Sequence, residues 1–258
     1  MTCVPAPPPP YPSGRKLLEG KTVLITAAAG TGIGFATAKR CIEEGATVFM
    51  SDLHERRWGE AVQKLGAPPS QVCDVTRESD VRALVAAAMQ ALGRIDVLVN
   101  NAGLGGSASI VEMTDEQWSK VLDVSLTSVF RMSRAVLPHM YERRSGVIVN
   151  NSSVLGWRAQ ALQSHYAAAK AGVMAFTRCA AIEAAEYGVR VNAVAPSIAV
   201  HEFLSRVASP DLLAELQRRE AFGRAAQTWE IANVIVFLAS DLSSYLTGEV
   251  ISASSQRA

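Results

Sequence analysis

The chain has 258 residues, 49% of them hydrophobic, and a formal net charge of +1 at pH 7. This length permits a sizeable core within one domain. The near-neutral balance, without a basic stripe or an acidic tail, argues against nucleic-acid binding, and no apolar run is long enough to predict a membrane span.

Residues 1–17 are rich in proline and lack the apolar stretch of a signal peptide. They predict an extended, mobile tail ahead of a single domain at residues 18–258. The four cysteines have no metal-ligand spacing, so we expect no metal site and a reducing, cytoplasmic location.

A short apolar run at 21–26 predicts a buried strand, and residues 35–44 predict a helix. Between them lies a glycine-rich turn whose backbone N–H groups, together with the helix N-terminus, are suited to a pyrophosphate. The expected cofactor-binding residues of this turn are Gly30, Thr31, Gly32 and Ile33.

A second predicted strand, 46–51, ends at Asp52. A carboxylate there accepts hydrogen bonds from ribose hydroxyls and repels a 2′-phosphate, which favours NAD over NADP. The basic residues His54, Arg56 and Arg57 are an alternative receptor for that phosphate, although a solvated first helical turn is our preferred interpretation.

The remaining chain continues to alternate between predicted strands and helices. Asp74 closes a short strand near 72–73 and is placed to reach an adenine amino group, and Thr114 is the predicted cap of a long helix. Residues 203–220 predict an amphipathic cover over the cleft. The other expected helices are 55–65, 78–92, 115–143, a helix ending near 187, and 229–240; the other strands are 95–99, 146–150, 189–194 and 248–253.

This alternation predicts an α/β fold, with a doubly wound parallel sheet and helices on both faces. Ligands bind beyond the carboxyl ends of such strands. The glycine-rich turn, Asp52, Asp74, Asn101 and Ser153 all follow predicted strands, so we expect them at one edge of the sheet.

Ser153 follows the apolar run 147–149, and Tyr166 and Lys170 lie four residues apart on a predicted helix. Residues at that spacing share one helix face. A hydroxyl, a phenol and an ammonium in one cleft are suited to proton transfer.

Together these motifs resemble the short-chain dehydrogenase/reductase family over roughly residues 18–251. The resemblance rests on the glycine-rich turn, Asp52, Cys73-Asp74-Val75, Asn100-Asn101-Ala102-Gly103, Ser153 with Tyr166-x-x-x-Lys170, and 191–196. It implies a single Rossmann-type sheet of about seven strands, a nicotinamide cofactor and a homotetramer. The tetramer is expected on helix 115–143 and on the Tyr166 helix, whose alanines permit close packing (Ala168, Ala171, Ala180 and Ala184).

The resemblance also implies roles for individual residues. Tyr166, as a phenolate, takes a proton from a substrate hydroxyl while hydride leaves for the nicotinamide; Lys170 supplies positive charge and Ser153 orients the substrate oxygen. The phenol of a free tyrosine titrates at ~10. To act as a base near pH 7, Tyr166 therefore needs its pKa lowered by roughly 3 units. Further implied cofactor contacts are Asp74, Val75, Asn101, Ala102, Gly103, Tyr166, Lys170, Pro196 and Ile198.

Several positions depart from the family pattern, among them Ser197 in place of the glycine after Pro196 and the C-terminal tail 252–258. The glycine-rich turn is one residue longer, Ser125 replaces the asparagine that usually completes the catalytic set, and His201 replaces a threonine that contacts the carboxamide. Ser125 is retained as the fourth expected catalytic residue.

Short runs around these sites resemble actinobacterial enzymes of steroid ring C/D degradation (IpdF-like), which act on a hydrindane acid carried as a CoA thioester. The candidate substrate residues are Trp157, Arg158, Gln163 and His201, with a core tryptophan and a surface arginine as the alternative. The resemblance favours NAD-linked oxidation or reduction of a bulky hydroxyacyl-CoA. The alternatives are a 3-oxoacyl-thioester reductase and a dinucleotide-binding scaffold without catalysis.

Overall fold

The computed structural model describes residues 7–200 and 210–255 of the chain. Their centre is one seven-stranded sheet in the order β3-β2-β1-β4-β5-β6-β7, in which every neighbouring pair is parallel. This confirms the predicted doubly wound sheet. The strands are β1 (Thr22–Ile25), β2 (Thr47–Asp52), β3 (Ser70–Val72), β4 (Val97–Asn100), β5 (Gly146–Asn151), β6 (Val189–Pro196) and β7 (Val250–Ala253).

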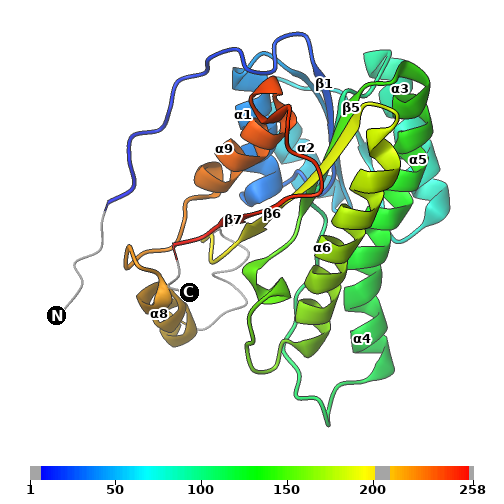
Figure 1. The fold of residues 1–258 in the computed structure, drawn as a ribbon. Helices are drawn as coiled ribbons and strands as arrows, with labels where there is room; N and C mark the ends of the chain where they lie inside the picture. The colour runs from blue at the N-terminus through cyan, green and yellow to red at the C-terminus, as the bar shows by residue number, and fades with distance from the viewer. Residues whose placement is uncertain (1–6, 201–209, 256–258) are drawn as a thin grey trace.

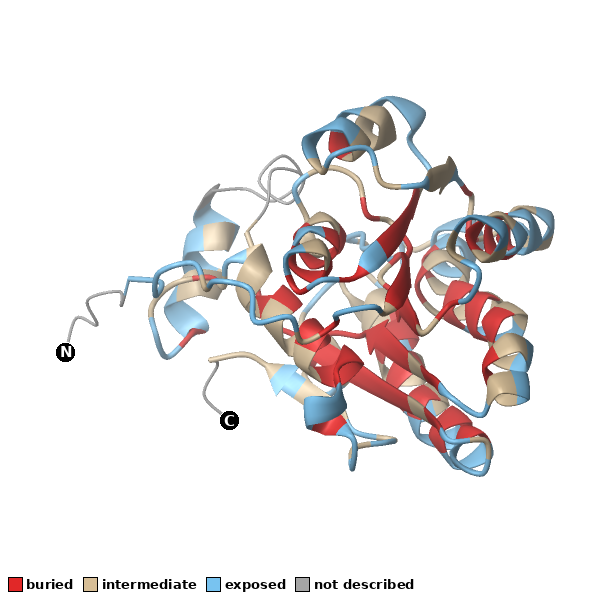
Figure 2. Ribbon diagram, turned by 90° about the horizontal axis from the view of Figure 1, so that it is seen from above, coloured by how far each residue is buried: buried red, intermediate tan, exposed pale blue. Residues whose placement is uncertain are grey.

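Helices cover both faces of the sheet (Figure 1). One apolar core lies between the sheet and helices α1 and α9, and a second lies between the sheet and helices α3, α5 and α6. Buried residues accordingly follow the strands and the inward sides of the helices (Figure 2). The helices are α1 (Ile33–Glu43), α2 (Glu55–Lys64), α3 (Glu78–Leu92), α4 (Asp115–Leu122), α5 (Ser128–Arg143), α6 (Ser164–Ala185), α8 (Pro210–Arg219) and α9 (Thr228–Ala239).

The helix predicted for residues 115–143 forms, but in three pieces. Thr114 and Gln117 make the capping box that begins α4, as expected for Thr114. Between α4 and α5 the chain takes one π-helical turn, Asp123–Thr127, with Ser125 at its centre. A π-turn accommodates one extra residue within a helix and is frequent at functional sites.

The chain order changes direction between β1 and β4, because β2 and β3 extend the sheet on one side and the later strands on the other. This is the topological switch point at which such sheets bind ligands. Of the predicted cover at 203–220, residues up to 209 lie outside the described residues, and the rest contains α8. Within the described chain, no helix combines the length and the apolar character that crossing a membrane requires.

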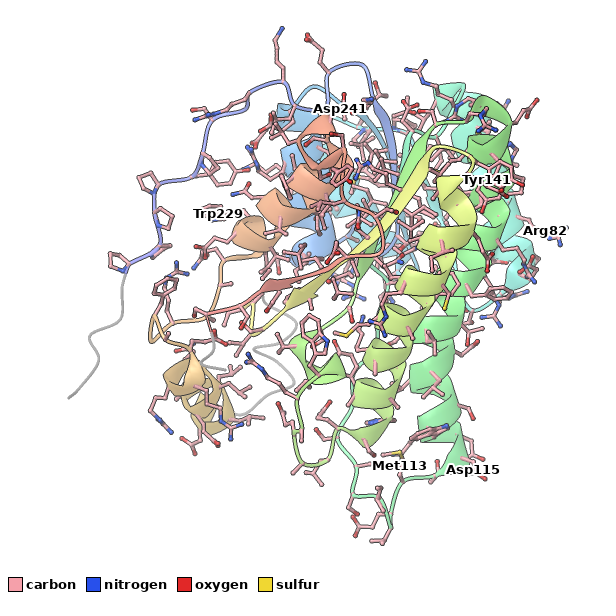
Figure 3. The ribbon with its side chains drawn as sticks, in the orientation of Figure 1. Arg82, Met113, Asp115, Tyr141, Trp229 and Asp241 are labelled. Atoms are coloured by element: carbon pink, nitrogen blue, oxygen red, sulfur yellow. The ribbon has the colours of Figure 1, made fainter. Side chains whose placement is uncertain are left out.

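Described residues of the predicted tail contact the domain. The Tyr11 hydroxyl donates to Glu43 over 2.7 Å, and its ring meets the edge of Trp229, which Figure 3 labels at the start of α9. The backbone N–H groups of Arg15 and Leu17 donate to the Glu44 carboxylate. The mobility of residues 1–17 in solution remains a prediction, but Tyr11, Arg15 and Leu17 have defined partners here.

Candidate active site

Ser153, Tyr166 and Lys170 meet at the carboxyl end of β5. Ser153 begins a short 3₁₀ turn directly after the strand, and its hydroxyl shares a hydrogen bond with the Tyr166 phenol. Lys170 lies one helical turn further along α6, with Nζ 5.6 Å from the centre of the Tyr166 ring. The structure therefore brings together the three residues that the sequence predicted as a proton-transfer group.

Two residues that the sequence analysis did not single out anchor this group. The Lys170 ammonium donates to the backbone carbonyl of Asn151 over 2.6 Å, and the Ser152 hydroxyl donates to the carbonyl of Lys170 over 2.9 Å. Both contacts tie α6 to the end of β5. A signal existed in the polar run Asn150–Ser153, which closes an otherwise apolar strand.

A chain of amides links this group to the glycine-rich turn. Asn151 Nδ2 donates to Asn101 Oδ1, and Asn101 Nδ2 donates to the carbonyls of Thr26 and Ala27. The Thr26 hydroxyl accepts from the backbone N–H groups of Asn101 and Ala102. The ends of β5, β4 and β1 are thus joined by side chains as well as by the sheet.

Burial shapes the acid–base properties of the pair. It lowers the pKa of Lys170, which is 97% buried, to about 8. It also raises the pKa of Tyr166 above its ordinary value of 10.0, an effect that the hydrogen bond with Ser153 opposes. The protein alone therefore favours the neutral phenol, and a further positive charge is needed to make Tyr166 a base near neutral pH.

The phenol of Tyr166 is expected to titrate above pH 10.0 in the protein without dinucleotide. Binding of oxidised nicotinamide brings a positive charge, which stabilises the phenolate and lowers this pKa. The measurement is the ultraviolet difference absorbance of phenolate against pH, with the Tyr166→Phe variant subtracted. A Tyr166 pKa that is already below 10.0 without dinucleotide would contradict the expectation.

The glycine-rich turn fits a dinucleotide phosphate. Gly30 has φ +79°, and a Cβ there would have open space around it; no side chain caps the N-terminus of α1 at Gly32. At Gly34 a Cβ would lie 2.3 Å from the Ala27 carbonyl oxygen, so only glycine allows the helix this close to the turn. Open backbone at a helix N-terminus is what a phosphate requires.

Asp52 lies at the end of β2 beside this turn. Its carboxylate accepts from the N–H of Ala29 over 3.1 Å and from the N–H of His54 over 3.0 Å. Burial raises the pKa of Asp52, while the hydrogen bond from Ala29 and the charge of Arg57 oppose that rise. The carboxylate is thus held at the turn, and Arg57 is near enough to influence it.

The other predicted cofactor residues also lie at the carboxyl edge. Asp74 follows β3 and accepts from the N–H and the hydroxyl of Thr76, and Val75 beside it is buried. Pro196 ends β6, and Ile198 follows it with its carbonyl accepting from Ala226. The structure therefore gathers these residues along one edge.

Ser125 lies close to the catalytic lysine but directs its hydrogen bonds elsewhere. It is fully buried, and its hydroxyl accepts from the N–H of Leu104 over 2.9 Å and donates to the carbonyl of Leu104 over 3.0 Å. A Cβ added at Gly103 would lie 3.3 Å from Lys170 Nζ and 3.9 Å from Ser125 Oγ. The serine is thus next to the site while binding the backbone of the loop that follows β4.

The predicted substrate residues differ in their exposure and in their hydrogen bonds. Trp157 follows the Ser153 turn and is 52% exposed, so its ring is available to a ligand. Arg158 is partly buried beside it. The Gln163 side-chain amide is bonded within the protein, since its Nε2 donates to the Gly106 carbonyl and the Ser107 hydroxyl. His201 lies outside the described residues.

A family model described as enoyl-(acyl carrier protein) reductase matches residues 27–255. The chain is 62% identical over 250 residues, 95% of each chain, to a Mycobacterium tuberculosis protein named (5R,7aS)-5-hydroxy-7a-methyl-1-oxo-2,3,5,6,7,7a-hexahydro-1H-indene-carboxyl-CoA reductase. The chain belongs to the short-chain dehydrogenase/reductase family. It is also 42% identical over 239 residues, 91% of this chain and 96% of the other, to 3-oxoacyl-[acyl-carrier-protein] reductase FabG of Thermotoga maritima.

The solved structures agree with this assignment. A short-chain dehydrogenase from Mycobacterium smegmatis superposes with a TM-score of 0.86 at 56% identity, covering 97% of this chain and 98% of the other. The chain is therefore an NAD(P)-dependent oxidoreductase that acts on CH–OH groups. This overturns the alternative of a dinucleotide-binding scaffold without catalysis.

Proposed function

We propose that this short-chain dehydrogenase/reductase interconverts a secondary alcohol and a ketone on a bulky alicyclic, steroid-derived acyl-CoA. The observation that carries the proposal is the 62% identity, over 95% of both chains, to a protein named as a hydroxy-methyl-oxo-hexahydroindene carboxyl-CoA reductase. The exposed Trp157, four residues after Ser153, supports it, because a flat aromatic surface suits an alicyclic ring system.

In the proposed reaction the residues of the chain move and hold protons. The bound nicotinamide supplies the chemistry of accepting or donating a hydride. Tyr166 takes the proton of the substrate hydroxyl during oxidation and returns it during reduction. Ser153 hydrogen-bonds the substrate oxygen, and Lys170, held by the Asn151 carbonyl, places its ammonium beside the phenolate.

We further propose that the cofactor is NAD. Asp52 at the end of β2 is held by the N–H groups of Ala29 and His54, at the position where the carboxylate repels a 2′-phosphate. Arg57 is the feature that favours NADP. The Asp52→Asn variant is expected to lose most of the NAD preference, and Arg57→Ala is expected to strengthen it.

The function is tested with a hydroxylated hydrindane carboxyl-CoA thioester and a straight-chain 3-hydroxyacyl-CoA, each with NAD and NADP, by following nicotinamide reduction. We expect kcat/KM to be at least about tenfold higher for the alicyclic thioester with NAD, which corresponds to about 1.4 kcal/mol of discrimination. Trp157→Ala should raise KM for the alicyclic substrate and leave the straight-chain value nearly unchanged. A higher kcat/KM for the straight-chain thioester would overturn the proposal.

A second candidate, reduction of 3-oxoacyl thioesters in lipid synthesis, is favoured by the 42% identity to the Thermotoga maritima reductase. It predicts a preference for NADPH and for the straight-chain arm of the same assay. Asp52 opposes it, because reductive biosynthesis generally draws on the phosphorylated cofactor and the carboxylate repels that phosphate.

We also propose a homotetramer in the cytoplasm. Helices α5 and α6 carry exposed large apolar side chains, with Phe130 at 42% and Ile182 at 80% exposure, which is typical of a surface that meets another chain. The alanines predicted for this contact do not all lie on that side: Ala180 and Ala184 are buried against the sheet of their own chain. Ala168 and Ile182 are exposed on α6, so the side of the helix that carries them is the one open to a partner.

A further inference from the structure

One buried acceptor at the carboxyl edge of the sheet has no partner within the chain. The side-chain oxygen of Asn151, Oδ1, accepts no hydrogen bond from any residue in the described ranges 7–200 and 210–255. Asn151 is only 9% exposed, so bulk water does not solvate this atom freely. An unpaired buried acceptor costs free energy, and native structures usually satisfy it with a ligand or an ordered water.

The neighbouring contacts fix which way the Asn151 amide points. Asn101 Nδ2 donates to the backbone carbonyls of Thr26 and Ala27 over 3.1 and 2.9 Å. Because a carbonyl only accepts, the amide nitrogen of Asn101 must face these two groups, and its oxygen faces Asn151. Asn151 Nδ2 donates to that oxygen over 2.9 Å. Exchanging the two ends of the Asn151 amide would bring two oxygens together, so Oδ1 is the end that is left without a donor.

Strand register places this oxygen on the face of the sheet that carries the glycine-rich turn. Side chains alternate between the two faces along a strand, so Asn151 shares a face with Val149, a residue of the core against α1 and α9. Asn151 also pairs with Val194 of β6, which belongs to the same core. A Cβ added at Gly34 of α1 would lie 2.4 Å from Asn101 Nδ2. The two linked asparagines therefore lie beside the start of the helix that follows the turn.

The strand order assigns this position to one half of a dinucleotide. The glycine-rich turn after β1 fits the pyrophosphate, and Asp52 and Asp74 lie on the β2–β3 side, where the adenosine half is expected. The other half then extends over the ends of β4, β5 and β6. Asn151 ends β5 between two expected cofactor residues, Asn101 after β4 and Pro196 at the end of β6.

We propose that Asn151 is a cofactor-binding residue whose Oδ1 accepts a hydrogen bond from the nicotinamide riboside half of the dinucleotide. That half carries two kinds of donor, the carboxamide N–H and the ribose hydroxyls, and either satisfies the buried oxygen. Asn151 also holds the Lys170 ammonium through its backbone carbonyl over 2.6 Å, so one residue contacts both the catalytic lysine and the cofactor. The inference needs the dinucleotide that the family assignment supplies, and it does not depend on the substrate.

The test measures dissociation constants by isothermal titration calorimetry for the full-length parent protein and for Asn151→Leu. Leucine has a similar shape to asparagine and cannot accept a hydrogen bond. The ligands are NAD, 3-acetylpyridine adenine dinucleotide (without the carboxamide N–H), ADP-ribose (without the nicotinamide) and AMP. We expect NAD to bind the variant about three- to tenfold more weakly, as for the loss of one hydrogen bond, and AMP to bind both proteins equally.

The pattern across the ligands identifies the donor. A loss confined to NAD assigns the carboxamide, and an equal loss for NAD, the acetylpyridine analogue and ADP-ribose assigns a ribose hydroxyl. Equal affinity of every ligand for the two proteins would overturn the proposal. A loss that includes AMP, or one that includes the acetylpyridine analogue and spares ADP-ribose, would also overturn it, because neither pattern fits a lost hydrogen bond to this half.

Thr177→Val is the matched control. It removes a buried hydroxyl that accepts from Asn150, whose side chain lies on the opposite face of β5. We expect the free energy of unfolding to fall in this variant and its dissociation constants to stay unchanged. A loss of NAD affinity equal to that of Asn151→Leu would contradict a specific contact.

If Asn151→Leu fails to fold, a crystal structure of the parent protein with NAD carries the test. Oδ1 should then lie about 2.7–3.2 Å from a nitrogen or oxygen of the nicotinamide riboside half. An ordered water as its only partner would overturn the proposal. NADP and its 2′-phosphorylated analogues allow the same comparison if the proposed NAD preference is wrong, so the two failures are distinguishable.

Discussion

Replacing Tyr166 with phenylalanine is expected to lower kcat by about 10²–10⁴-fold, the range that a positioned general acid–base contributes. The change removes the oxygen that shares a hydrogen bond with Ser153 and leaves the ring against the backbone at Gly105. Lys170 keeps its bond to the Asn151 carbonyl. Steady-state rates and the dinucleotide dissociation constant are the two measurements.

The dinucleotide dissociation constant is expected to stay within about threefold of the parent value. Tyr187→Phe is the matched control, since Tyr187 stacks on Tyr141 away from the sheet edge and should retain full activity. Substantial turnover by the Tyr166 variant would remove the phenol from the proposed mechanism, whatever the substrate.

Replacing Glu44 with alanine is expected to lower the free energy of unfolding by about 3 kcal/mol or more, as for other broken buried ion pairs. Glu44 is 1% exposed, and its carboxylate binds the Arg40 guanidinium over 2.5 Å together with the N–H groups of Arg15 and Leu17. Without it, the buried arginine loses a partner and two backbone donors lose their acceptor. Urea unfolding followed by tryptophan fluorescence measures the change.

The contribution of Glu44 to the free energy of unfolding depends on pH. Burial alone would raise the pKa of Glu44, but the N–H groups of Arg15 and Leu17 and the charge of Arg40 outweigh it and lower the pKa below 4.5. The stabilisation is therefore present above the unfolded value of about 4.3 and is lost as the pH falls through the folded pKa. Glu43→Ala, at a more exposed position, is the control and should lower the free energy of unfolding by less. An equal loss in the two variants would contradict the larger contribution expected of Glu44.

The sequence predicted the sheet and the catalytic edge well because both leave strong local signals. Apolar runs such as 22–25 and 97–99 mark buried parallel strands, and a polar residue that ends each run marks the ligand edge. Helical spacing put Tyr166 and Lys170 on one helix face, and the family resemblance implied their roles. Asp52 was placed correctly at the turn, but the influence of Arg57 on it needed coordinates.

What the sequence did not predict depends on backbone partners. The contact between Lys170 and the Asn151 carbonyl leaves no mark on residue type, since any residue at 151 offers a carbonyl. The sequence showed that Ser125 departs from the family pattern. Its partner, the backbone of Leu104, is distant in sequence and leaves no mark on residue type either. Gln163 stays a predicted substrate residue, and its hydrogen bonds to the Gly106 carbonyl and the Ser107 hydroxyl likewise have no local signal in the sequence.

The π-turn at Asp123–Thr127 adds one residue to the helical stretch that contains it. Val121 and Met140 are both buried and lie nineteen positions apart, one more than the roughly eighteen positions of five α-helical turns. Deleting one residue here would leave the roughly eighteen positions of five regular turns, so α4 and α5 would keep their buried faces while the π-turn that contains Ser125 was lost. The hydroxyl of Ser125 would then swing away from the loop after β4, so the spare residue is a geometric requirement of the site.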